Sequence, residues 1–89
     1  MAAQNTAAVS WQENGPHLRV YASDGVTVTE RCYDGSWYTG QFQQAGQTAS
    51  ATCWFDNGPY IRVYCTNAGV TTEYCWDNTG PWYQGGYSA

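Results

Sequence analysis

The sequence predicts an all-β fold in which a single domain contains two tandem four-stranded units. Three observations support this prediction: the chain repeats itself at an offset of 43 residues, short alternating segments bounded by turn residues fill both copies, and no stretch shows helical periodicity. The 89 residues suffice for one small domain. We therefore expect one domain over 1–89, with repeats at approximately 8–46 and 51–89.

The repeat is defined by rare residue types that recur in the same order. Tryptophan, cysteine, arginine and glutamate all return at matching positions, and two extra residues enter the second copy before its last segment. The matching segments, first copy before second, are LRVY and IRVY (18–21 and 61–64), TERCYD and TEYCWD (29–34 and 72–77), and WYTG and WYQG (37–40 and 82–85).

Each copy contains short segments rich in β-forming residues. The dipeptide Asp24-Gly25 separates two of them and is a strong signal for a two-residue hairpin. Asn14-Gly15-Pro16 and Asn57-Gly58-Pro59 are typical of turns. We expect strands near Ala8–Gln12, Leu18–Ser23, Val26–Arg31, Trp37–Gln41 and Ala49–Phe55.

Four short strands in about 43 residues match the size of one β-propeller blade. Two blades cannot close a ring, because a propeller needs about four to eight. The sequence therefore predicts that identical chains associate. Two, three or four chains would give four, six or eight blades, and the repeat alone does not choose among them.

Composition and charge restrict the partners. The side-chain cations other than the single histidine are three arginines, and the net charge is −4, which argues against nucleic acids and anionic membrane surfaces. No apolar run is long enough to cross a membrane. The first residues, MAAQNTAAVS, lack the features of a secretory signal, so localisation stays open. Aromatic residues make up 17% of the chain and favour either a large β core or ring surfaces for a ligand.

The four cysteines do not have the spacing of a metal site. They stand at positions 32, 53, 65 and 75 without a CxxC pair, and one histidine is too few for a typical mixed zinc site. Without a secretion signal, we expect four free thiols rather than disulfides. No metal and no other cofactor is expected.

Two arginines are expected to face glutamates. If Asp24-Gly25 forms the hairpin loop, Arg19 lies directly opposite Glu30, and Arg62 and Glu73 repeat the same spacing. An ordinary surface ion pair is the alternative, and it would contribute only about 0–1 kcal/mol. Recurrence in a chain so poor in cations favours a sugar site instead. The guanidinium can donate to two sugar oxygens, the carboxylate can accept from hydroxyls, and indoles can cover the C–H face.

These same segments resemble a known family. IRVY, TERCYDG (29–35), TTEYCWD (71–77) and WYTG are similar to motifs of the Aleuria-type fucose-specific lectins. The resemblance is greatest to the short bacterial members with two repeats per chain, and it extends from about Thr6 to Tyr87. It implies two four-stranded blades per chain and a six-bladed β-propeller completed by a homotrimer. It also implies a multivalent, non-catalytic lectin that binds L-fucose and fucosylated glycans without calcium.

The resemblance further implies two fucose sites per chain, each between adjacent blades. In the within-chain site, Arg and Glu bind hydroxyls, one indole donates its N–H, another packs on the sugar methyl group, and a backbone group adds a hydrogen bond. The residues are Arg19, Glu30, Trp82, Trp76, Tyr38 and the backbone of Gln41. The between-chain site takes Arg62, Glu73, Trp37 as donor, Tyr33 and Tyr83 as ring surface, and the backbone of Gly86.

Other conspicuous residues are expected to have structural roles. We expect Trp11 and Trp54 in the core between blades, Asp34 and Asp77 as turn caps, and His17 on the surface.

Two other functions fit the repeat less well than a lectin does. A glycosidase-like propeller would need two carboxylates about 5–9.5 Å apart across one bond, whereas Glu30 and Glu73 fall on separate blades. A protein-interaction propeller would vary its repeats in the very residues that recur here. We therefore expect no enzyme activity, and a glycan array would separate the lectin from the interaction module.

Overall fold

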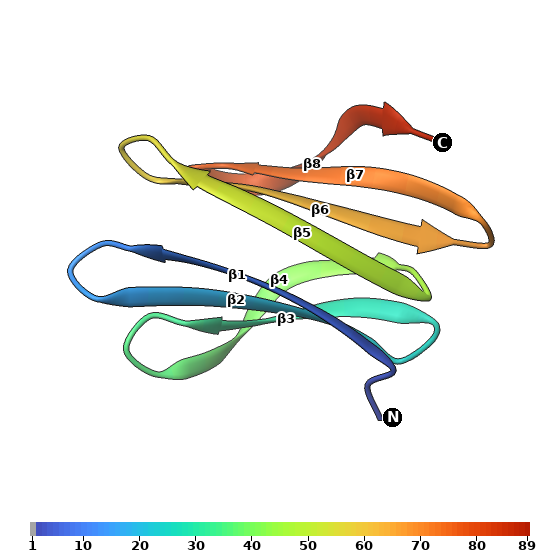
Figure 1. Ribbon diagram of the computed structural model, residues 1–89, viewed down its shortest axis with the longest axis horizontal. Helices are drawn as coiled ribbons and strands as arrows, with labels where there is room; N and C mark the ends of the chain where they lie inside the picture. The colour runs from blue at the N-terminus through green and yellow to red at the C-terminus, as the bar shows by residue number, and fades with distance from the viewer. Residues whose placement is uncertain (1) are drawn as a thin grey trace.

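The computed structural model describes residues 2–89 and is all-β in that range. The strands form two four-stranded antiparallel sheets in sequence order, β1-β2-β3-β4 and β5-β6-β7-β8 (Figure 1). The prediction of an all-β chain with two four-stranded units is confirmed, and the two sheets are consistent with two propeller blades. The strands are β1 (Asn5–Gln12), β2 (Pro16–Ser23), β3 (Thr27–Tyr33), β4 (Trp37–Ala45), β5 (Thr48–Phe55), β6 (Pro59–Asn67), β7 (Val70–Asp77) and β8 (Thr79–Ser88).

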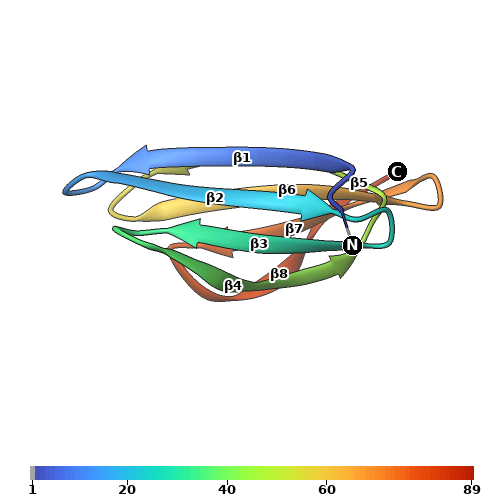
Figure 2. The same ribbon diagram turned by 90° about the horizontal axis from the view of Figure 1, so that it is seen from below.

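The two sheets lie face to face, with the first strand of each at the closest approach. Between the two sheets, β1 makes most of the contacts with β5, and β2 also contacts β5. Figure 2 shows β4 and β8 together at the edge opposite β1. The sheets are therefore close along β1 and β5, and β4 and β8 form the opposite edges of their sheets.

The core fills the space between the sheets. Alternation along the strands directs one face of the first sheet and the opposite face of the second toward each other. This alternation buries large side chains from β2, β3 and β4 against aliphatic ones from β6. The buried cluster consists of Val9, Trp11, Tyr21, Val28, Phe42, Ala49, Ile61, Val63 and Cys65.

The predicted register of the first hairpin is wrong by two residues. Arg19 pairs with Cys32, and Tyr21 pairs with Glu30. The cause is the side chain of Asp24, whose Oδ1 accepts hydrogen bonds from the backbone N–H groups of Val26 and Thr27, both at 2.9 Å. Such an Asx turn places Asp24 before the loop instead of at its centre. Since the side-chain period of a strand is two, the shift leaves Arg19 and Glu30 on one face.

The predicted strands lie within the observed ones except at the start of β3, and several observed strands are longer. β1 begins at Asn5 instead of Ala8, and β4 continues to Ala45 instead of ending at Gln41. The pairing of β3 with β4 is irregular between Thr29 and Arg31. No helix within residues 2–89 is long and apolar enough to cross a membrane.

All four cysteines are free thiols in the structure. Burial raises the pKa of Cys32 and of Cys65 to about 11. We therefore expect the native protein at mildly alkaline pH to react at these positions at least about tenfold more slowly than the unfolded chain. Thiol counting in urea without reductant should give four groups per chain. A smaller number in a fresh sample would show that a disulfide forms.

Candidate functional site

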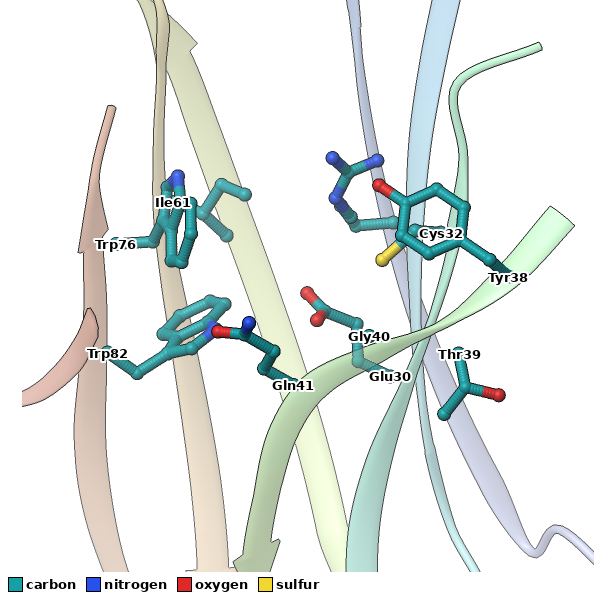
Figure 3. Close-up of a pocket in the computed structure, with 10 residues that line it drawn as sticks. Glu30, Cys32, Tyr38, Thr39, Gly40, Gln41, Ile61, Trp76 and Trp82 are labelled. Atoms are coloured by element: carbon teal, nitrogen blue, oxygen red, sulfur yellow. The ribbon is translucent and has the colours of Figure 1, made fainter. Parts of the chain in front are cut away.

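A cavity of about 240 Å³ opens between the two sheets. Figure 3 shows Trp76 and Trp82 on one side, facing Glu30 and Tyr38 across the space, with Gln41 between them. All six residues that the sequence assigned to the within-chain site line this one cavity. The complete lining is Arg19, Glu30, Cys32, Tyr38, Thr39, Gly40, Gln41, Ile61, Trp76 and Trp82.

Two tryptophans of the second sheet form the aromatic wall. The Trp76 and Trp82 ring centroids lie 5.6 Å apart with the planes tilted by 50°. The Trp82 ring meets Phe42 of the first sheet in a T-shaped contact at 4.7 Å, which fixes its position across the junction. Both indoles stay partly exposed, so they can offer apolar surface to a ligand in the cavity.

Glu30 supplies a buried carboxylate at the cavity. The Tyr21 hydroxyl donates to Glu30 Oε2 at 2.7 Å, and the backbone N–H of Phe42 donates to Oε1 at 3.4 Å. Burial and the neighbouring Glu30 raise the pKa of Tyr21, so this phenol stays a donor. A carboxylate has about four acceptor positions, and two donors leave capacity for ligand hydroxyls.

The ionic partner of Arg19 is Asp34, so the expected Arg19–Glu30 pair is wrong. Arg19 Nη1 and Nη2 donate to the two carboxylate oxygens of Asp34 at 2.9 and 3.1 Å. The register places Arg19 opposite Cys32, which brings it nearer the turn that follows β3. Asp34 binds a site arginine and is therefore not simply the turn cap that we expected.

Aromatic rings hold the same guanidinium from other directions. The Arg19 Cζ lies 4.8 Å from the centroid of Trp11 and 6.0 Å from that of Tyr38. The Tyr38 hydroxyl also donates to Asp34. Burial would raise the pKa of Asp34, but hydrogen bonds from Arg19, Tyr38 and His17 outweigh it and hold the pKa well below its usual range. Asp34 is thus a carboxylate at any ordinary pH.

Trp11 is in the core as predicted, but it also contacts this arginine. Trp54, its counterpart in the second repeat, is largely exposed in the single chain, so the core position expected for it between blades stays a prediction. Arg62 Cζ lies 4.9 Å from the Trp54 centroid, which repeats the contact of Arg19 with Trp11. The tryptophans on β1 and β5 therefore lie beside the site arginines.

The second sheet repeats the polar arrangement. Arg62 Nη1 donates to Asp77 at 2.7 Å, so Asp77 also binds an arginine. The Tyr83 hydroxyl donates to Asp77, and this hydrogen bond raises the pKa of Tyr83 to about 12. The Tyr64 hydroxyl donates to Glu73 at 2.8 Å, as Tyr21 does to Glu30.

The residues assigned to the between-chain site form two groups, one on each sheet. Arg62, Glu73, Tyr83 and Gly86 belong to the second sheet, and Tyr33 and Trp37 to the first. Tyr33 pairs with Trp37, and their ring centroids lie 5.2 Å apart. Strand alternation puts Tyr33 on the face opposite Arg19, and Arg62 on the face opposite Ile61. The two groups thus lie on the outward faces of the stacked sheets.

Some lining residues were not predicted from the sequence. Cys32 and Gly40 recur as Cys75 and Gly85, so the repeat itself could have identified them. His17 was expected to be only a surface residue. Its Nδ1 instead lies 2.5 Å from Asp34 Oδ1, and its ring stacks on Trp11.

Within residues 2–89, no group of three or more histidine, cysteine, aspartate or glutamate side chains could hold a metal ion. The cavity offers hydrogen-bond donors, a carboxylate and two indoles to a ligand.

Comparison with known proteins gives no matching family model and no matching curated protein.

Proposed function

We propose that this protein is a multivalent, non-catalytic lectin for L-fucose and fucosylated glycans, and that identical chains complete it as a six-bladed trimeric propeller. The observation that carries the proposal is the cavity between the sheets. There Arg19 and Glu30 face Trp76 and Trp82 across a space of monosaccharide size. Its volume of about 240 Å³ is below the roughly 300–1,000 Å³ of pockets for drug-sized ligands.

The chemistry of the lining suits a neutral sugar. The guanidinium offers a fork of donors, and the carboxylate can accept from adjacent hydroxyls. The two indoles cover apolar C–H groups, and the methyl group of fucose is suited to the surface of Trp76. The resemblance of the repeat motifs to the Aleuria-type lectins supports fucose within this class.

Ring formation is supported by the unequal burial of equivalent residues. Trp11 is 8% exposed at the junction between the sheets, whereas Trp54 is 47% exposed on the outer face of the second sheet. Phe42 is 2% exposed, and its counterpart Tyr87 is 50% exposed. The exposed face of the second sheet therefore corresponds to the face of the first sheet that the second sheet buries, as expected if another chain covers it.

The outer face of the first sheet is the complementary half. Leu18 is half-buried there, while its counterpart Ile61 is buried at the internal junction. Trp37 lies on the same outer face and is exposed, whereas its counterpart Trp82 lines the cavity. Two different complementary faces give a head-to-tail interface, and such an interface forms a ring when the rotation between neighbouring chains adds up to a full turn. A second chain on this face would also unite Arg62 and Glu73 with Tyr33 and Trp37.

The function is tested by calorimetric titration with methyl α-L-fucoside on a sample of measured mass. We expect two fucosides per chain, with unchanged affinity in EDTA because the proposed site needs no metal. Methyl α-D-glucoside serves as the control sugar and should bind much more weakly. Absence of heat with the fucoside, from a folded and assembled protein, would contradict the proposed function.

The assembly is tested by light scattering, which should give about three times the 9.9 kDa of one chain. Trp54→Ser should shift the protein toward smaller species, since the indole would no longer fill the interface. Val70→Ser is the matched control, because Val70 is similarly exposed but lies in a hairpin at the end of the second sheet. A trimer unaffected by Trp54→Ser would place the interface elsewhere, and a tetramer would contradict the blade count.

A further inference from the structure

His17, the single histidine of the chain, lies between two oxygen atoms at the start of β2. Its Nδ1 is 2.5 Å from Asp34 Oδ1, and its Nε2 is 2.8 Å from the backbone oxygen of Glu13. A carboxylate oxygen and a carbonyl oxygen only accept hydrogen bonds, so each ring nitrogen needs a hydrogen. A neutral imidazole has one N–H, and only the imidazolium satisfies both contacts.

The carboxylate of Asp34 connects this ring to the sugar cavity. Oδ1 of Asp34 accepts from both His17 and Arg19, and its Oδ2 accepts from Arg19 and from the Tyr38 hydroxyl. On the other side, the His17 ring is stacked on Trp11 at 5.5 Å with the planes 6° apart. The charged and titratable groups facing His17 are thus Asp34 and Glu13 and, through Asp34, Arg19 and Tyr38.

We propose that His17 is a positioning residue of the within-chain sugar site, acting through Asp34 on Arg19, so that sugar affinity at this site depends on pH near neutrality. This inference rests on the proposed function and adds a control of affinity to one of its two sites. The protonated ring fixes the Asp34 carboxylate, and the fixed carboxylate holds the guanidinium in place before the sugar binds.

The second repeat has no histidine at the equivalent position and therefore serves as an internal comparison. Tyr60 occupies the position of His17 and stacks on Trp54 at 5.5 Å with the same 6° between planes. Asp77 keeps hydrogen bonds from Arg62 and Tyr83 but has no imidazole beside it. A tyrosine carries no charge near neutral pH. The between-chain site should therefore respond little to pH in this range.

The direction of the effect follows from the two contacts of the ring. The hydrogen bond to Asp34 and then the one to the Glu13 backbone raise the pKa of His17 above its usual 6.5. The imidazolium is thus present below about 6.5 and is lost as pH rises through the raised value. Loss of the proton leaves one nitrogen lone pair against an oxygen, so the ring moves and Asp34 holds Arg19 less firmly.

The experiment measures fucoside affinity at about pH 5.5 and about pH 8.5 for each site separately, using the range over which an imidazole titrates. Arg62→Ala keeps the within-chain site, and Arg19→Ala keeps the between-chain site. We expect the within-chain affinity to fall about two- to fivefold toward high pH, the size of a partly exposed ionic contact. The between-chain affinity should be flat, and adding His17→Tyr to Arg62→Ala, which copies Tyr60, should abolish the dependence.

A second measurement uses the unmodified protein. Because coupling is reciprocal, fucoside should raise the pKa of His17, read from its ring signals by NMR, by about 0.3–0.7. If two fucosides bound per chain but the pKa of His17 did not change and neither affinity depended on pH, the inference would be overturned and the proposed lectin function would stand. Equal pH dependence at both sites would also overturn it. No fucoside binding at any pH would overturn the proposed function and this inference together.

Discussion

Replacing Arg19 with alanine is expected to lower the number of fucosides bound per chain from two to one. Among the described residues that line the within-chain cavity, Arg19 is the one cation, and in the proposed lectin its guanidinium would offer the sugar paired donors. Hydrogen bonds to charged groups contribute about 1.5–3 kcal/mol each, so loss of two should weaken the site more than about 100-fold. Calorimetry with methyl α-L-fucoside measures the stoichiometry, and light scattering verifies that the assembly persists.

Arg62→Ala is the matched control and should remove the other site. Each single variant still has linked sites and should keep much of its binding to a fucosylated surface, while the double variant should lose agglutination. Arg19→Lys preserves the charge but not the planar fork, so it should weaken the same site as Arg19→Ala. If Arg19→Ala still bound two fucosides per chain, Arg19 would not contact sugar and the site would have to be reassigned.

The repeat made much of the fold predictable. The strong period and the alternation within each copy predicted two four-stranded sheets, and the parity of the strands placed Arg19 and Glu30 on one face. The exact register was not predictable from the Asp24-Gly25 signal, because Asp24 uses its side chain to accept from Val26 and Thr27. The second copy held the missing signal: Asn67 aligns with Asp24, and Ala68-Gly69 follows at the centre of the loop.

The network behind Arg19 was harder to predict. Asp34 stands just after β3, where a turn cap is the ordinary role for aspartate, and only the register brings it to the guanidinium. The role of His17 could not be predicted, because the repeat aligns it with Tyr60 and so suggests that both residues only stack on a neighbouring ring. The stacking is indeed shared, but the hydrogen bonds of the imidazole are particular to the first copy.

The close approach of Glu30 to Gly40 gives the last large effect. A Cβ at Gly40 would lie 2.6 Å from Glu30 Cδ and 2.8 Å from Cys32 Sγ, so Gly40→Ala should displace the carboxylate. Overpacking costs about 1–3 kcal/mol, and a buried hydroxyl or carboxylate that loses its partner costs about as much again. We therefore expect the free energy of unfolding to fall by about 2–6 kcal/mol. Binding at the within-chain site should be lost.

Gly85→Ala tests the equivalent contact with Glu73 on the exposed face of the second sheet, and thereby tests whether a neighbouring chain covers that face in a closed ring. A Cβ there would lie 2.7 Å from Glu73 Cδ, but Glu73 is only half-buried in the single chain. In a closed ring a neighbour covers Glu73 as the second sheet covers Glu30, so both variants should destabilise the protein similarly in urea at one fixed concentration. Gly86→Ala is the control, since a Cβ there meets no atom within 4 Å. A much milder effect of Gly85→Ala than of Gly40→Ala would mean that no neighbouring chain covers this face.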